Sequence, residues 1–306
     1  MNNKRFTFNF MNNIEIEISS LCNRHCNNCT VSKIERERKL LPINLFEKIM
    51  KELKEINYSG DIAFHQYNEP LLEFDHLCEC IKCAKNYNPN ARLNLFTNGD
   101  LFTKDKFKLL KKIGVNNFFI TCHFDNYESW SKQLAYRKVK LMANKLSLHC
   151  GKFIISDNLI TFRMFKIIEI LSKLKKDGYS KIKKYPCYVN IISKNYGKIG
   201  STRLNTVKMP VKKTTIKTDL VPYCYSLLHG LHISYKGNIH MCCDCCEDSN
   251  QSRPYLIGSI NESNIYDLFA KKYELIQNYI NETNDTICNE CYWNSEEMYD
   301  SEMWLL

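Results

Sequence analysis

The sequence predicts an α/β protein built on a mainly parallel sheet, because segments typical of strands and of helices alternate along most of the chain. Short runs rich in isoleucine and phenylalanine recur between amphipathic stretches that have the helical period. Six strand–helix units fit between residue 14 and about residue 193, the last without a clear helix. An open barrel and a doubly wound sheet both have this order of elements.

The expected elements follow one another in a regular order. Strands are expected at residues 14–18, 61–65, 92–96, 117–124, 152–156 and 187–193. Helices are expected at residues 42–56, 74–87, 103–113, 127–146 and 159–176. Thr103 is the expected N-cap of its helix, and Gly178 ends the last one. In both architectures reactive groups gather in the loops at the carboxyl ends of the strands.

The chain divides into three predicted parts. Residues 1–193 carry the alternating elements. Residues 194–223 are rich in lysine and threonine, contain Pro210 and Pro222 and show no strong period, so we interpret them as a connecting segment. Residues 224–306 form a smaller cysteine-rich domain.

Composition excludes some classes of function. The 306 residues carry a net charge of +10 from scattered lysines, without an arginine stripe, so nucleic-acid binding is not expected and an acidic or phosphorylated substrate stays open. The N-terminus lacks an apolar signal core, and no apolar run approaches the roughly 18 residues that a membrane span needs. We therefore expect a cytoplasmic protein without membrane association. Cytosolic thiols stay reduced, so 16 cysteines indicate metal or redox chemistry rather than disulfides.

A C-x3-C-x2-C motif of Cys22, Cys26 and Cys29 directly follows the first expected strand. A structural zinc site closes with four ligands, whereas three cysteines on a cubane cluster leave one iron open. An open position is typical of a catalytic metal. His25 is a conceivable fourth zinc ligand, but its place between two ligands four positions apart is cramped.

This loop resembles the radical S-adenosylmethionine (radical SAM) superfamily. The resemblance implies a partial (β/α)6 TIM-like barrel, with residues 1–193 as the radical SAM core. It also implies that Cys22, Cys26 and Cys29 hold a [4Fe–4S] cluster whose open iron binds S-adenosyl-L-methionine (SAM). Members of the family cleave SAM reductively to a 5′-deoxyadenosyl radical, which abstracts hydrogen.

Further motifs that resemble the family fall after later strands. Tyr67-Asn68-Glu69 resembles the family's Gly-Gly-Glu motif, with Glu69 as the expected acceptor for the ammonium of SAM. The turn that begins at Thr97 and Asn98 matches a recurring Thr/Ser-Asn-Gly sequence, where Gly99 permits a positive φ. The loop after the last strand resembles one that contacts the ribose and carboxylate of the cofactor, and its candidate residues are Asn190 and Ser193.

A second cysteine set lies in the C-terminal part. An expected β-hairpin turns at residues 236–238, and Gly237 precedes Cys242 by five positions. This segment resembles the twitch form of the SPASM auxiliary-cluster domain, which implies one auxiliary [4Fe–4S] cluster bound by Cys224, Cys242, Cys288 and Cys291. Full thiolate ligation suits electron transfer. The alternative is a structural zinc knuckle that uses the same four residues.

Other cysteines have weaker signals. Cys78, Cys80 and Cys83 lie along an expected helix and are interpreted as packing residues. Three more thiols adjoin Cys242 and could replace it, form another site or donate a hydrogen atom; they are Cys243, Cys245 and Cys246. His123 and Asp125 follow the fourth strand at the expected active edge. The candidates for a catalytic residue are Cys245, Cys246 and His123.

The leading functional hypothesis is a radical SAM oxidoreductase that takes a hydrogen atom from a C–H bond of a small polar, sugar- or aminocyclitol-like substrate. The Cys-x17-Cys and C-x2-C spacings resemble those of radical SAM dehydrogenases that oxidise a secondary alcohol of an aminocyclitol. The auxiliary cluster would accept an electron, and flavodoxin or ferredoxin is the expected external donor.

Two alternatives stay open. The first is a peptide-modifying maturase or epimerase, in which a cysteine returns a hydrogen atom. We expect no leader-binding domain ahead of the barrel, because the first strand begins near residue 14, and this weakens that alternative. The second is a zinc-binding module without catalysis.

Overall fold

One open sheet organises the protein. The computed structural model describes residues 11–27, 29–125, 128–149, 151–164, 187–194, 229–250 and 255–281, without the side chains of 277–281. Its ten strands have the order β10-β9-β8-β1-β2-β3-β4-β7-β6-β5. The central strands run parallel; they are β1 (Asn13–Ile16), β2 (Asp61–Ala63), β3 (Arg92–Thr97), β4 (Val115–Thr121) and β7 (Tyr188–Lys194). The predicted partial barrel is confirmed, and in the described residues it does not close.

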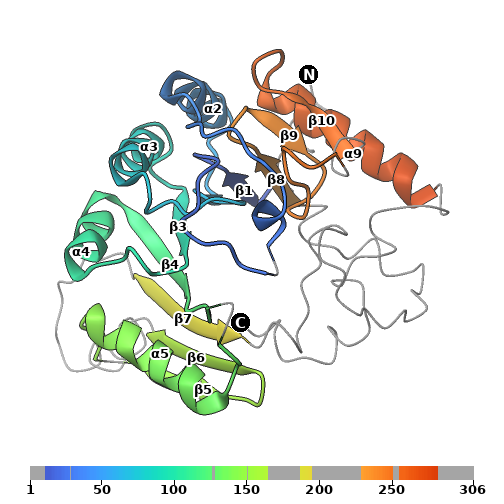
Figure 1. The fold of residues 1–306 in the computed structure, drawn as a ribbon. Coiled ribbons are helices and arrows are strands. Elements are labelled where there is room, and N and C mark those ends of the chain that lie inside the picture. Colours follow the sequence, from blue (N-terminus) through green and yellow to red (C-terminus); the bar gives the residue numbers. More distant parts are fainter. Residues whose placement is uncertain are drawn as a thin grey trace.

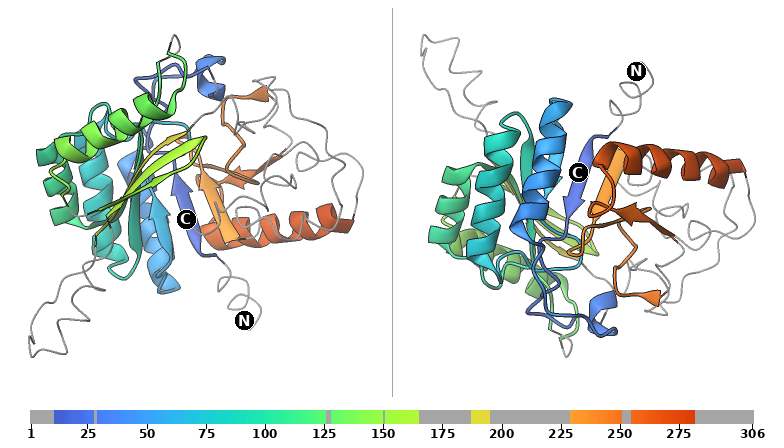
Figure 2. Two further views of the ribbon diagram at one scale, coloured as in Figure 1. Left: turned by 90° about the horizontal axis from the view of Figure 1, so that it is seen from below. Right: turned by 90° about the horizontal axis from the view of Figure 1, so that it is seen from above.

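Helices cover the outer face of the sheet (Figures 1 and 2). They are α2 (Ile43–Glu55), α3 (Phe74–Tyr87), α4 (Lys104–Ile113) and α5 (Lys132–Lys145). As predicted, Thr103 caps α4, since its side chain accepts a hydrogen bond from the backbone N–H of Lys106. The loop after β4 is longer than predicted, so that α5 begins at Lys132 rather than near residue 127.

The main core lies between these helices and the sheet, because the apolar stripe of each helix faces inward. On α2 the buried stripe comprises Leu45, Phe46, Ile49, Met50 and Leu53. Around α4 three aromatic rings pack together, with the Phe118 ring 4.8 Å from Phe107 and 5.9 Å from Phe102. Strand side chains alternate between faces, so the residues next to Phe118 point to the opposite, inner face.

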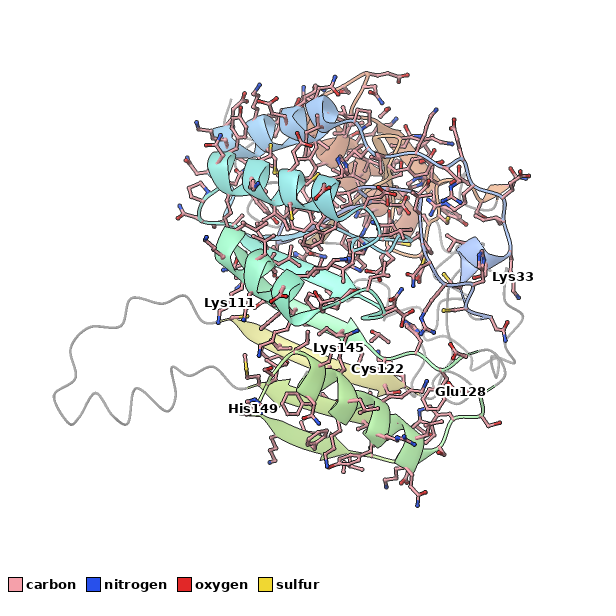
Figure 3. All side chains as sticks on the ribbon, turned by 60° about the vertical axis from the view of Figure 1, so that its left-hand side comes forward. Lys33, Lys111, Cys122, Glu128, Lys145 and His149 are labelled. Carbon is pink, nitrogen blue, oxygen red and sulfur yellow. The ribbon has the colours of Figure 1, made fainter. Side chains whose placement is uncertain are left out.

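The loops that follow the parallel strands gather at one edge of the sheet. Lys111 and His149, near the C-terminal ends of α4 and α5, lie at one edge in Figure 3. Lys33 and Glu128, in the loops after β1 and β4, lie at the opposite edge. That second edge collects the loops that follow the parallel strands, and it is where the sequence predicts the reactive groups.

The helix predicted at residues 159–176 is wrong for residues 159–164, the part of it that the structure describes. Residues 159–164 form strand β6 (Leu159–Met164), which pairs antiparallel with both β5 (Lys152–Ile155) and β7. Ile160 and Phe162 are buried on the side of α5, and Thr161 between them is buried on the opposite face, as the alternating side chains of a strand allow. Five parallel strands and an added hairpin therefore replace the six expected strand–helix units. Residues 165–176 and Gly178 lie outside the described part.

The C-terminal segment extends the same sheet. Strand β8 (Gly230–Ile233) pairs in parallel with β1 and forms the predicted hairpin with β9 (Asn238–His240), where Gly237 has a φ of +83°. Strand β10 (Leu256–Ser259) continues the sheet, and α9 (Ile265–Asn281) lies beside α2 (Figure 1). The backbone N–H of Ile265 donates to the Glu52 carboxylate on α2 at 2.7 Å. Among the helices that the structure describes, none is long and apolar enough to cross a lipid bilayer.

The junction between β1 and β8 contains an ion pair. Glu15 Oε2 lies 3.0 Å from His232 Nδ1, and the two residues are register partners. Burial alone would raise the pKa of Glu15, but the charge and hydrogen bond of His232 outweigh it and lower that pKa to about 2. Because its pKa is lower in the folded protein, Glu15 stabilises the fold above its unfolded pKa of about 4.5. This contribution is lost as the pH falls toward 2.

We predict that Glu15→Gln lowers the free energy of unfolding by about 3 kcal/mol at most at pH 7, and that the difference from wild type shrinks between pH 4.5 and pH 2. Urea unfolding of metal-free protein across this pH range measures it. Glu79→Gln, on the exposed side of α3, is the control. A pH-independent difference would contradict the role of the ion pair.

Candidate functional site

The three cysteines of the predicted cluster loop follow β1 at the reactive edge of the sheet. Cys22, Cys26 and Cys29 are all partly exposed and unbridged. The backbone N–H of Cys29 donates to the Cys26 carbonyl at 3.0 Å, and the Arg24 N–H approaches Cys22 Sγ at 3.4 Å. The loop is thus a tight turn that presents its thiols at this edge.

A salt-bridged clamp fixes this loop to the neighbouring strand ends. Arg24 binds both carboxylate oxygens of Asp100, with N–O distances of 2.5 and 2.7 Å, and reaches Asp125 at 3.3 Å. Asn23 donates to Asp100 at 3.1 Å and accepts from the side chain of Asn98 at 2.8 Å. Asp100 and Asn98 follow β3 and Asp125 follows β4, so the clamp joins the ends of three parallel strands. A bidentate arginine–carboxylate pair is a strong and directional contact.

Glu69 lies beside the cysteine loop and is 2% exposed. Its backbone N–H donates to the carbonyl of Leu21 at 2.8 Å. Its carboxylate accepts from Thr97 Oγ1 at 2.7 Å and from the Asn98 N–H at 2.7 Å. The Leu71 N–H donates to it as well, at 3.0 Å. Among the residues that the structure describes, no cation forms an ion pair with Glu69.

The electrostatics of this site fit a cationic ligand and a metal. Burial raises the pKa of the Glu69 carboxyl, against the hydrogen bonds from Thr97, Asn98 and Leu71, so an ammonium group bound here would stabilise its charge. Burial also raises the pKa of the Cys22 thiol to about 11, and the charges of Glu69 and the other two loop cysteines add to the rise. A bound metal would displace that proton, because the thiolate is the ligand.

The remaining predicted cofactor residues have varied surroundings. Tyr67 is buried, and its N–H donates to Glu17 at 3.2 Å. Asn68 closes a local turn, accepting from the Gln66 N–H at 3.1 Å. Ser193 donates to the Cys122 carbonyl at 3.0 Å and lies on the helix-covered side of β7. Asn190 lies on the inner face of β7, and His123 is partly exposed after β4.

A buried arginine joins the first loop to the C-terminal segment. Arg36 binds Glu17 at 2.9 Å and Asp248 at 2.8 Å. It also donates to the backbone carbonyls of Ser20 and Tyr67, both at 3.2 Å. Its side chain is 6% exposed. Burial disfavours the charged form, but Glu17, Cys246 and Asp248 outweigh it and raise the pKa of Arg36 above its usual range.

The cysteine loop after β9 packs against this arginine. Cys242 Sγ lies 3.8 Å from Cys245 Sγ, and the Cys245 carbonyl accepts from Gln66 Nε2 at 3.3 Å. Cys245 and Cys246 are buried, and Cys243 is partly exposed. Among the predicted auxiliary ligands, Cys242 follows β9, and the first cysteine loop follows β1, two strands away in the sheet. Cys224, Cys288 and Cys291 lie outside the described residues.

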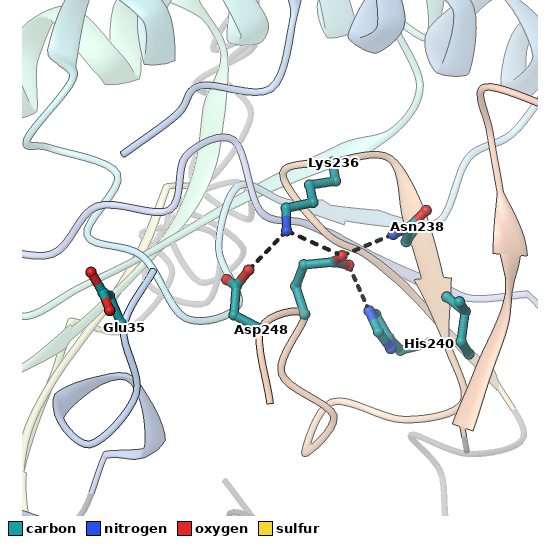
Figure 4. A pocket seen from close by; sticks show the side chains of 7 residues that line it. Glu35, Lys236, Asn238, His240 and Asp248 are labelled. Atoms are coloured by element: carbon teal, nitrogen blue, oxygen red, sulfur yellow. Dashed lines mark hydrogen bonds and ion pairs between the residues drawn. The ribbon is translucent and has the colours of Figure 1, made fainter. Parts of the chain in front are cut away.

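A polar pocket of about 490 Å³ borders this second cysteine loop (Figure 4). Glu247 accepts from His240 at 3.0 Å and from Asn238 at 2.8 Å, while Lys236 binds Asp248 at 2.9 Å. Burial opposes ionisation of Glu247, yet the hydrogen bonds from His240, Ser234 and Asn238 lower its pKa to about 2. The charges of the pocket therefore fix the loop against the β8–β9 hairpin.

The described cysteine loops do not have the geometry of a single-ion site. Within the described ranges, no three histidine, cysteine or carboxylate side chains converge on a point where one metal ion would sit. A closed zinc site places four ligands around one point. The cysteines of a cubane bind separate irons and need no common point.

Sequence motifs did not identify the charged residues that connect these loops. Arg24, Arg36, Glu17, Asp100 and Asp248 were not predicted as site residues. Asp100 directly follows the Thr97-Asn98-Gly99 turn and Arg24 lies between two motif cysteines, so their positions carried a weak signal. For Asp248, the sequence signal was only its position close to the C-terminal cysteines.

Comparison with known proteins agrees with the motifs. Residues 16–143 match the model of the radical SAM superfamily, and residues 224–292 match that of SPASM, an iron–sulfur cluster-binding domain. Over 112 residues the chain is 36% identical to the S-adenosyl-L-methionine-dependent 2-deoxy-scyllo-inosamine dehydrogenase of Niallia circulans. That match covers 36% of this chain and 44% of the dehydrogenase, so less than half of the relative is spanned.

Solved structures share the fold. BtrN in complex with AdoMet and 2-DOIA has a TM-score of 0.56 and 21% identity, over 87% of this chain and 86% of that one. BtrN in an open conformation has a TM-score of 0.55 and 19% identity, over 95% and 98% of the two chains. At these identities the likeness concerns the arrangement of the elements.

We predict that Arg24→Gln loosens the cysteine loop, because it removes the bidentate contact with Asp100. Iron bound per chain after anaerobic reconstitution should fall, while the thermal midpoint of the rest of the protein changes little. Arg92→Gln is a matched control, since Arg92 binds Asp61 bidentately at 2.7 and 2.9 Å at the opposite edge of the sheet. Equal iron loading in both variants would contradict a role for the clamp.

Proposed function

Because this chain belongs to the radical SAM superfamily and carries an iron–sulfur cluster-binding SPASM domain, we propose that it is an oxidoreductase acting on a small polar, sugar- or aminocyclitol-like substrate. Family membership implies SAM and a [4Fe–4S] cluster, and the SPASM domain implies auxiliary iron–sulfur ligation. The observation that carries the proposal is the buried Glu69 carboxylate beside the three-cysteine loop.

The residues present fit these groups. Cys22, Cys26 and Cys29 would hold the first cluster, and Glu69 would accept the ammonium of SAM. Thr97 and the backbone of Asn98 orient the Glu69 carboxylate, since each donates to one of its oxygens at 2.7 Å. When bound, the cluster and SAM together supply a radical able to remove hydrogen from an unactivated C–H bond.

The auxiliary ligands proposed are Cys224, Cys242, Cys288 and Cys291. Arg36 and Gln66 hold the loop of Cys242 against the residues that flank Glu69. Loss of one hydrogen atom, then of one electron and one proton, converts a secondary alcohol to a ketone. Four-thiolate ligation suits acceptance of that electron. The substrate class is supported by the partial match to the inosamine dehydrogenase, and the first electron would come from flavodoxin or ferredoxin.

We predict that the anaerobically reconstituted protein is brown, with about eight irons per chain if two [4Fe–4S] sites fill. With SAM and a reductant it should release 5′-deoxyadenosine, and Cys26→Ala should abolish that release. Cys83→Ala, on α3, is the control and should leave it intact. Colourless protein with stoichiometric zinc, or continued release from Cys26→Ala, would refute the proposal. Deuterium transferred from a labelled substrate into 5′-deoxyadenosine would identify the carbon attacked.

We predict that Glu69→Gln weakens SAM binding about 10- to 100-fold, because a hydrogen bond between two charged groups is lost. Equilibrium binding of SAM measures this, and the cluster absorbance should stay near the wild-type value. Glu47→Gln, which changes a partly exposed side chain on α2, provides the control. Unchanged affinity in Glu69→Gln would show that the ammonium binds elsewhere.

A further inference from the structure

The inner face of the sheet carries a continuous row of side chains next to the proposed SAM site. His65 stacks on Phe96 with ring centroids 4.1 Å apart, and Phe96 stacks on Phe119 at 4.5 Å. Phe119 is the register partner of Asn190 on β7, and Asn190 is the partner of Arg163 on β6. Residues in register share a face, so the row runs from the loop of Glu69 to Arg163.

Two members of this row have buried polar atoms for which the described residues provide no hydrogen-bond partner. Asn190 is 8% exposed, and its Oδ1 accepts no hydrogen bond from a described residue. No described residue pairs with Nε or Nη2 of Arg163, which lie on one edge of its guanidinium. An unsatisfied buried polar group is costly, and a charged one more so. The pair thus offers two parallel donors and one acceptor to a ligand.

A second cation lies on the same face. Lys194 is four positions beyond Asn190 on β7, nearer the reactive edge, and forms no ion pair with a described carboxylate. Burial lowers the pKa of Lys194, and no described carboxylate opposes this effect. Arg163 likewise pairs with no described carboxylate. The face of β6 and β7 is therefore locally cationic.

Several described side chains of this face are partly exposed. Phe119, Tyr188, Ile192, Arg163 and Lys194 alternate with residues that face the helices, and all five are partly exposed, whereas Thr161 and Asn190 on the same face are buried. On the helix-covered side Val189, Ile191 and Ser193 are fully buried. A ligand bound here would rest on the Phe119 ring and pair with the buried polar atoms of Arg163 and Asn190.

We propose that the inner face of β6 and β7 binds an anionic oxygen group, a carboxylate or a phosphate, of a polyhydroxylated substrate. Nε and Nη2 of Arg163 donate to two oxygens of this group in the bidentate geometry that guanidinium favours. Asn190 Oδ1 accepts from a hydroxyl, and Lys194 adds positive potential. The inference rests on the proposed function, because it names the charge of that substrate. Within the proposed substrate class, an anionic sugar-like molecule therefore fits this face better than an amine-bearing cyclitol.

The distance across the sheet agrees with this assignment. Phe96 directly precedes Thr97, one of the residues that contact Glu69. Three strand spacings of about 4.8 Å separate Phe96 from Arg163, which amounts to about 14 Å. A substrate anchored by its anionic group at Arg163 and lying along Phe119 and Phe96 would thus extend its other end toward Glu69 and the cysteine loop.

The test is equilibrium binding by calorimetry to the reconstituted protein with SAM and without reductant, so that no turnover is needed. Glucuronate and glucose 6-phosphate are the carboxylate and phosphate probes, glucose is the neutral one and glucosamine the cationic one. At least one anionic probe should bind about 10- to 100-fold more tightly than glucose, with glucosamine weakest. Which anion binds better distinguishes a sugar acid from a sugar phosphate.

Variants assign the effect to residues. Arg163→Gln should abolish the preference for the anion, Arg163→Lys should retain part of it, and Lys194→Gln should reduce it less. Arg92→Gln, a bidentate arginine at the other edge, should keep it. Equal binding of glucose and both anions, no binding of either anion, or a full preference in Arg163→Gln overturns the inference. Release of 5′-deoxyadenosine without substrate should be unchanged in Arg92→Gln. Absence of that release in the wild-type protein would refute the proposed function and not the subsite, so the two failures are distinguishable.

Discussion

The contact on which the arrangement of the two cysteine loops depends is the buried guanidinium of Arg36. It binds the carboxylates of Glu17 and Asp248 and the carbonyls of Ser20 and Tyr67. These partners come from the end of β1, the loop after β2 and the C-terminal cysteine segment. Because removing one member of a buried ion network leaves the others unpaired, such networks tolerate few arrangements. Arg36 thereby sets the position of one cysteine loop relative to the other and relative to Glu69.

Much of the fold could be predicted because its signals are local. The parallel strands β1 to β4 and the helices between them have clear periodicity, and Thr103 caps α4 as expected. Strand β6 shows why the rest could not be predicted. Its alternation spans only six residues within a longer apolar stretch, and pairing with β7 decided its structure. That pairing is a tertiary contact, and local propensity does not reveal it.

The candidate site divides in the same way. Cys22, Cys26, Cys29, Glu69 and Thr97 sit in short motifs at strand ends, so their order along the chain is sufficient to propose them as candidates. The clamp of Arg24 and the ion pair of Arg36 were not predictable, because the partners are far apart in the sequence. Arg24 and Asp100 are 76 positions apart, and Arg36 and Asp248 are 212 positions apart. With 33 acidic residues available to each arginine, composition cannot select a partner. Only the register of the sheet brings these charges together.

The inner face shows how the same register prepares a binding surface. A closed barrel of this class fills its interior with branched apolar side chains. Here the inner row below the reactive edge contains Asn94 and Asn117, which bond to each other at 2.7 Å, and the next row contains Phe96, Phe119 and Asn190. This lining of amides and aromatic rings offers hydrogen-bonding groups and flat stacking surfaces that an aliphatic interior lacks. The charge of Arg163, which pairs with no described carboxylate where β6 joins the row, gives a ligand on this face a preferred sign.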